Sequence, residues 1–81
     1  MIKNQFKTFK SLVSNQIEII KNMDEVQQEE LYGATIELLT IVSTTVKFTE
    51  LKEEKLIDYI ENQTGLMYSE ILNIEENYYH F

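Results

Sequence analysis

The sequence predicts an all-α protein, a small antiparallel four-helix bundle, with residues 1–81 forming a single helical domain. The chain contains no proline and only two glycines, whereas β-rich or loop-rich domains need more of both for their turns. Apolar residues recur at intervals of three and four along most of the chain, which is the period of amphipathic helices. Short polar connections separate these stretches, and short connections favour antiparallel neighbours.

The first helix is predicted over residues 3–22. Its core-facing positions alternate in steps of four and three, as in a heptad seam: Ile2, Phe6, Phe9, Val13, Gln16, Ile20 and Met23. Lys3, Lys7 and Lys10 form a separate basic ridge. We interpret this ridge as solvated or paired with acidic residues, with a membrane-surface or docking role as the alternative.

The second helix is predicted to start at Asp24 and to end near Phe48, with Asp24 as N-cap and Gln27 completing a capping box. Two neighbouring apolar stripes follow its length, and its second half is almost uncharged, so it is expected at the centre of the fold. Residues 40–46 are rich in β-branched side chains but continue the helical stripes. Gly33 is expected to mark a close helix crossing. The first stripe contains Leu31, Ala34, Leu38, Ile41, Thr45 and Phe48; the second contains Thr35, Leu39, Val42 and Val46.

The third helix is predicted over residues 50–63, with Thr49 as N-cap. Gly65 suits the left-handed position that ends a helix. The fourth helix is predicted over residues 67–79, with a second heptad seam formed by Met67, Ile71, Ile74, Tyr78 and Phe81.

The charge balance limits the classes of partner that the chain is expected to bind. Seven lysines and no arginine face fourteen acidic residues, which gives a net charge of −7. A nucleic-acid backbone repels such a chain, and arginine, the preferred ligand of phosphate, is missing, so direct nucleic-acid binding is not expected. The absence of cysteine excludes disulfides, thiolate metal sites and a cysteine nucleophile.

No catalytic motif is present, and we expect a non-enzyme without cofactor or metal. Glu76 and His80 stand four residues apart, but two ligands alone do not form a metal site. Neighbouring carboxylates on a helix diverge by about 100°, which does not suit acid–base catalysis. No apolar stretch approaches the roughly 20 residues of a membrane span, so a cytoplasmic location is expected, with proximity to a membrane surface left open.

Two groups of residues are candidate contact sites. Glu50, Glu54, Asp58 and Glu61 are predicted to form an acidic ridge along the third helix, either solvated or able to dock a basic partner. The aromatic end of the chain includes Tyr78, Tyr79 and Phe81, which are expected either to pack onto the first helix or to form a contact surface. Two heptad seams and these aromatic side chains also predict self-association as a homodimer.

The segment VKFTELKEEKLI, residues 46–57, resembles the region before the last helix in immunity proteins of pediocin-like (class IIa) bacteriocins. The resemblance is carried by Phe48-Thr49-Glu50, followed by Glu53-Glu54 and Leu56-Ile57. It implies a cytoplasmic antiparallel four-helix bundle that protects a producer cell by acting at the bacteriocin-engaged mannose permease. This chain is shorter and more acidic than that family.

The expected function is therefore non-catalytic. We expect a small acidic helical protein that binds a partner protein with a basic surface, as an immunity or neutraliser protein does. Two alternatives remain: a phage- or plasmid-encoded inhibitor whose acidic face blocks a nucleic-acid-binding site, and a small oligomeric structural subunit.

Overall fold

The computed structural model of the chain describes residues 2–78. The described part contains four helices and no strand: α1 (Ile2–Lys21), α2 (Gln28–Phe48), α3 (Glu53–Thr64) and α4 (Tyr68–Tyr78). The predicted all-α fold and small helical bundle are therefore confirmed, and residues 40–46 lie within α2. Among the described helices, none is long and apolar enough to cross a membrane.

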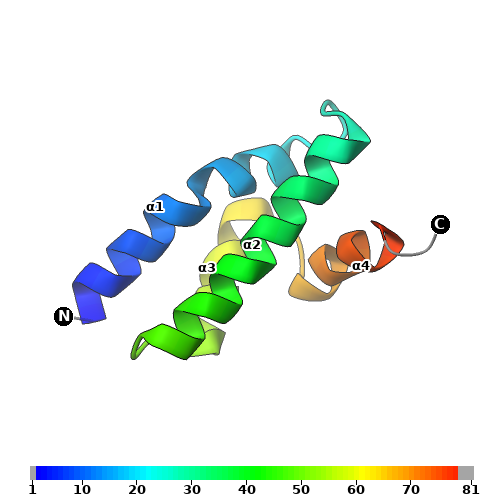
Figure 1. Ribbon diagram of the computed structural model, residues 1–81. Helices are drawn as coiled ribbons and strands as arrows, with labels where there is room; N and C mark the ends of the chain where they lie inside the picture. The colour runs from blue at the N-terminus through cyan, green and yellow to red at the C-terminus, as the bar shows by residue number, and fades with distance from the viewer. Residues whose placement is uncertain (1, 79–81) are drawn as a thin grey trace.

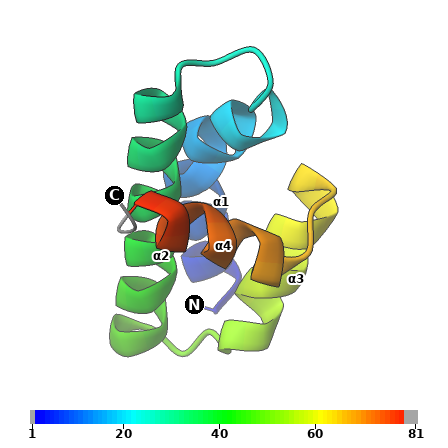
Figure 2. The ribbon, with the colours of Figure 1, turned by 90° about the vertical axis from the view of Figure 1, so that its right-hand side faces the viewer.

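The arrangement of the helices makes α2 the common packing surface. Helices α1 and α2 run antiparallel, and α3 lies behind them (Figure 1). Figure 2 shows α4 running across α2 and α3, where the three preceding helices run more nearly alongside one another. Helix α2 contacts α1, α3 and α4. This position agrees with the nearly uncharged sequence of its second half, because an uncharged helix face gains most from being covered.

One hydrophobic core joins the four helices and the connection between α2 and α3. On α1 the buried side chains follow the predicted seam, and the rings of Phe6 and Phe9 pack against Tyr59 of α3 with centroid distances of 5.6 and 6.3 Å. The core therefore joins α1 to both of its neighbouring helices, α2 and α3. Its buried members are Phe9, Val13, Ile17, Ile20, Leu38, Val42, Leu51, Leu56, Ile60 and Ile71.

The start of the second helix differs from the prediction. Asp24 does not cap α2, which begins at Gln28 after an N-cap residue, Gln27, that makes no side-chain capping bond. Asp24 instead lies in the turn 22–27, where backbone hydrogen bonds continue briefly beyond the end of α1. This continuation keeps Met23 packed against the core, so the chain reverses only after it.

The start of the third helix also differs. Thr49 does not cap α3 but ends α2: its Oγ1 donates to the carbonyl of Thr45 at 2.6 Å and accepts the backbone N–H of Leu51 at 3.1 Å. The backbone at Thr49 is extended, which brings the buried side chain of Leu51 into the core. Helix α3 begins only at Glu53, after Lys52.

The end of α3 repeats this use of a threonine. Oγ1 of Thr64 donates to the carbonyl of Ile60 at 2.8 Å and accepts the N–H of Leu66 at 3.2 Å. Gly65 adopts the predicted left-handed conformation with φ of 75°, and its N–H donates to the carbonyl of Glu61 at 2.9 Å. A side chain at this φ would be strained, which explains the glycine.

Candidate functional site

The structure divides the predicted acidic ridge. Glu50 lies before α3, in the connection after α2, where its backbone N–H donates to Oε1 of Gln5 at 3.3 Å. Glu54 and Asp58 lie on α3 and are exposed. The predicted row of four carboxylates along one helix is therefore wrong, because the helix begins three residues after Glu50.

Glu61, the last residue of that ridge, joins α3 to α4. Its Oε2 accepts the backbone N–H of Tyr68 at 2.7 Å, and Oε1 of Glu70 accepts the N–H of Met67 at 3.2 Å. These carboxylates satisfy N–H groups at the start of α4, where the helix dipole also favours negative charge. Glu61 thus has a structural contact that sequence spacing alone did not indicate. Met67, expected in the buried seam of the fourth helix, precedes α4 and is exposed.

The phenol of Tyr68 lies in the same region. Burial raises its pKa above the ordinary value of 10.0, and the carboxylates of Glu53 and Glu75 raise it further because they oppose a phenolate. Tyr68 therefore remains neutral in the folded protein at physiological pH, in a position where the surrounding charge is negative.

Of the aromatic end, only Tyr78 belongs to the described residues, and Tyr79, His80 and Phe81 lie outside them. The ring of Tyr78 meets that of Tyr32 on α2 edge to face, with a centroid distance of 5.3 Å and an interplanar angle of 65°. The contact places Tyr78 against α2, whereas packing of the aromatic end onto the first helix was one of the two expectations.

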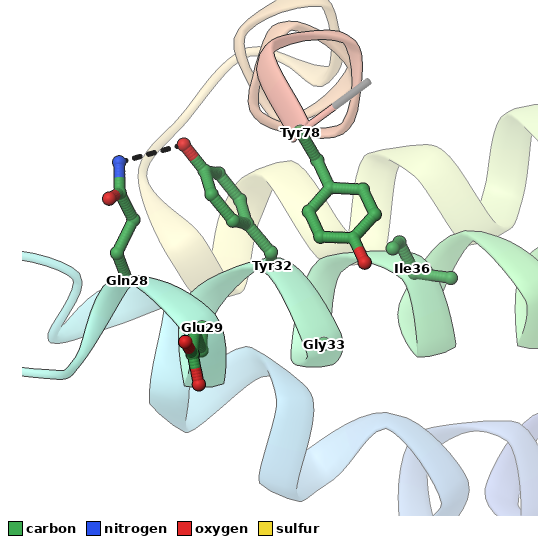
Figure 3. A pocket seen from close by; sticks show the side chains of 6 residues that line it. All are labelled: Gln28, Glu29, Tyr32, Gly33, Ile36 and Tyr78. Atoms are coloured by element: carbon green, nitrogen blue, oxygen red, sulfur yellow. Dashed lines mark hydrogen bonds between the residues drawn. The ribbon is translucent and has the colours of Figure 1, made fainter. Parts of the chain in front are cut away.

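A hollow between α2 and α4, which we call the tyrosine notch, has a volume of about 460 Å³. Figure 3 shows the ring of Tyr78 descending from α4 beside Tyr32 and Ile36. Nε2 of Gln28 donates to the hydroxyl of Tyr32 at 2.8 Å. The lining residues are Gln28, Glu29, Tyr32, Gly33, Ile36 and Tyr78.

Gly33, which lines this notch, does not mark a close crossing of two helices. A Cβ atom placed on Gly33 would meet no other atom within 4 Å, so the expected close approach of a neighbouring helix is wrong. Gly33 has no positive φ either. No packing or backbone requirement within the described chain accounts for this glycine.

A second hollow, the α1–α2 groove, has a volume of about 430 Å³ and is lined without any charged side chain. Phe48 and Leu12 border it and are 73% and 54% exposed. The lining residues are Asn4, Gln5, Thr8, Phe9, Leu12, Thr44, Thr45, Phe48 and Thr49.

The exposure of Phe48 contradicts its predicted place in the core stripe of the second helix. A strict heptad pattern drifts by about 20° per heptad around a straight helix. Ala34, Ile41 and Phe48 follow one another at heptad spacing, and they are buried, half-buried and exposed respectively. The drift therefore carries the end of the stripe out of the core and onto the rim of the α1–α2 groove.

The two hollows differ in their lining, and neither contains, among the described residues, a cluster suited to a metal ion. No group of three or more histidine, cysteine or carboxylate side chains in residues 2–78 is placed to hold a metal ion. The α1–α2 groove suits an apolar side chain, and the tyrosine notch combines aromatic rings with a carboxylate. Sequence reasoning missed both hollows because each is built from two helices. The spacing of Glu29, Tyr32, Gly33 and Ile36 on one helix face was the available signal for the notch.

Comparisons of this chain with protein-family models, with curated proteins and with solved structures found no match.

Proposed function

We propose that this protein is a non-catalytic binding protein that attaches to a partner protein and changes what the partner can do, as an immunity or neutraliser protein does. The observation that carries the proposal is the α1–α2 groove with Phe48 exposed on its rim. The ammonium of Lys47 lies 5.5 Å from the centre of the Phe48 ring, but the groove that this ring borders has no charged side chain in its lining. An uncharged hollow beside an exposed aromatic side chain has the composition of the buried centre of protein interfaces.

The uncharged lining is informative because the rest of the chain is strongly charged. Charged residues form 26% of the sequence, yet none lines this groove. Apolar contacts at the groove supply affinity, and the net charge of −7 attracts a partner with a basic surface around its own apolar side chain. Two copies of this chain repel each other by the same charge, which favours a different protein as the occupant.

The experiment compares capture by the wild-type chain and by Phe48→Ser from a lysate of the native host, with bound proteins identified by mass spectrometry. Leu72→Ser is the matched control, because Leu72 is an exposed apolar residue outside the groove. We expect one basic protein to bind the wild type and the Leu72 variant but not the Phe48 variant. Circular dichroism checks that all three remain folded.

Equal capture by the Phe48 and Leu72 variants would overturn the proposed role of the groove. The identity of the captured protein separates the versions of the function. A membrane permease favours the immunity type, whereas a partner released by added nucleic acid favours an inhibitor that blocks a nucleic-acid-binding site. A dimer in light scattering, lost in Phe48→Ser, would instead favour the structural subunit.

Charge contributes mainly to the rate of association. Changing Glu54 and Asp58 together to Lys removes two exposed carboxylates from α3 and adds two positive charges. We expect slower association with the captured partner at low salt and a smaller difference at high salt, since exposed charges are then screened.

A further inference from the structure

We propose that the tyrosine notch receives a cationic side chain, an arginine or a lysine, presented by the protein partner. The inference rests on the proposed function for the existence of that partner. It involves residues separate from the α1–α2 groove, and it is tested on this chain alone, so either proposal can fail without the other.

The geometry of the notch supplies the groups that hold a cation. Glu29, Tyr32, Gly33 and Ile36 of α2 line the notch, and the ring of Tyr78 from α4 lies beside Tyr32 and Ile36 (Figure 3). The rings of Tyr32 and Tyr78 meet at 65°, so their faces point in different directions around the hollow. Aromatic faces attract ammonium and guanidinium groups. The carboxylate of Glu29 is directed away from the two rings (Figure 3), so it adds negative charge at the edge of the notch.

Gly33 is the strongest indication that something outside the chain occupies this hollow. A glycine inside a helix is less stable than alanine, because it loses more backbone freedom on folding. The space beside Gly33 is open, so alanine would fit there without moving a neighbour. The glycine therefore preserves an empty volume that the fold itself does not use.

The charge around the notch selects the sign of the occupant. Residues 22–46 and 56–81, which contain all lining residues, include ten of the fourteen acidic residues and none of the seven lysines. Within these segments the formal charge of the lysine, aspartate and glutamate side chains is therefore entirely negative. A positively charged group is attracted to this region, and an anion is repelled.

The test titrates the ¹⁵N-labelled full chain with Nα-acetyl-lysine methylamide and with Nα-acetyl-arginine methylamide. Nα-acetyl-norleucine methylamide is the neutral control with an apolar stem. We expect saturable NMR shifts centred on Tyr32 and Gly33 for at least one cationic probe, with a dissociation constant in the millimolar range. The neutral probe should produce none.

Variants at the notch separate binding from stability. Gly33→Ala and Gly33→Leu fill the hollow progressively, so we expect a graded loss of probe affinity. Both should raise the melting temperature, by about 4–8 °C for alanine. Glu29→Gln should weaken binding about two- to fivefold. Glu30→Gln is its matched control, since Glu30 is also an exposed first-turn carboxylate but does not line the notch.

Three results would each overturn the inference. One is equal shifts with the norleucine probe, which would show apolar binding only. Another is unchanged affinity in Gly33→Leu despite a raised melting temperature. The third is an equal effect of Glu29→Gln and Glu30→Gln, which would mean that general electrostatic attraction, and not the notch, holds the probe.

Discussion

Replacing Glu61 by Ala tests whether this residue belongs to a functional acidic surface or to the joint between α3 and α4. In the structure its Oε2 accepts the N–H of Tyr68 at 2.7 Å. Glu61 lies in the last turn of α3, where the dipole of that helix disfavours a negative charge. Its position is explained by α4, whose first N–H groups need acceptors.

The expected cost of Glu61→Ala is about 1–2 kcal/mol of unfolding free energy. A hydrogen bond to a charged group contributes about 1.5–3 kcal/mol, and the partial exposure of Glu61 places the loss toward the lower end. Loss of a helix N-cap costs a similar amount, about 0.5–2 kcal/mol. In a domain of this length each kcal/mol lowers the melting temperature by about 4–8 °C, so the loss is readily measured.

The assay is urea unfolding followed by far-UV circular dichroism, with Glu54→Ala as control. Glu54 is an exposed glutamate on the same helix, and we expect its removal to change stability by no more than about 0.5 kcal/mol. Glu61→Gln keeps an acceptor oxygen and should lose less than Glu61→Ala. Equal stability of the Glu61→Ala and Glu54→Ala variants would refute the structural role of Glu61.

Two further predictions concern burial. Leu38→Ala should lower the free energy of unfolding by about 3–5 kcal/mol because Leu38 is fully buried. Leu12→Ala should lower it by less than about 1 kcal/mol because Leu12 is 54% exposed. Urea unfolding measures both losses, and similar losses would contradict the core assignment. Burial raises the pKa of Tyr68, so the folded protein keeps the phenol protonated at a pH where the unfolded chain loses the proton. The stability that the neutral phenol contributes is complete below pH 10 and is lost as the pH rises through the folded-state pKa. Unfolding of Tyr68→Phe between about pH 8 and 11 should show a flatter decline than the wild type, and parallel curves would refute this.

Much of the helical pattern was predictable because it depends on local periodicity. The seam of α1, the helical continuity of residues 40–46 and the left-handed Gly65 all follow from spacing or from backbone sterics. Helix starts were predicted less well. Asp24 and Thr49 are good capping residues, but packing of nearby apolar side chains moved both helix starts toward the C-terminus.

The candidate sites were less predictable than the helices. Glu54 and Asp58 remain exposed on α3, while Glu50 precedes the helix and Glu61 is used within the fold. Whether Glu54 and Asp58 contact a partner stays a prediction. The notch was not identified because Tyr78 lies on α4, 42 residues beyond Ile36 of α2 in the sequence.

The sequence by itself determined the helical class, the order of the helices and most side chains of the core. These depend on interactions within one helix and on the burial of one apolar face. The tertiary structure alone decided which end of the α2 stripe is uncovered, which carboxylate joins α3 to α4, and where the notch and the groove lie. Such features depend on where neighbouring helices end and how they cross, and residues distant in the sequence set both.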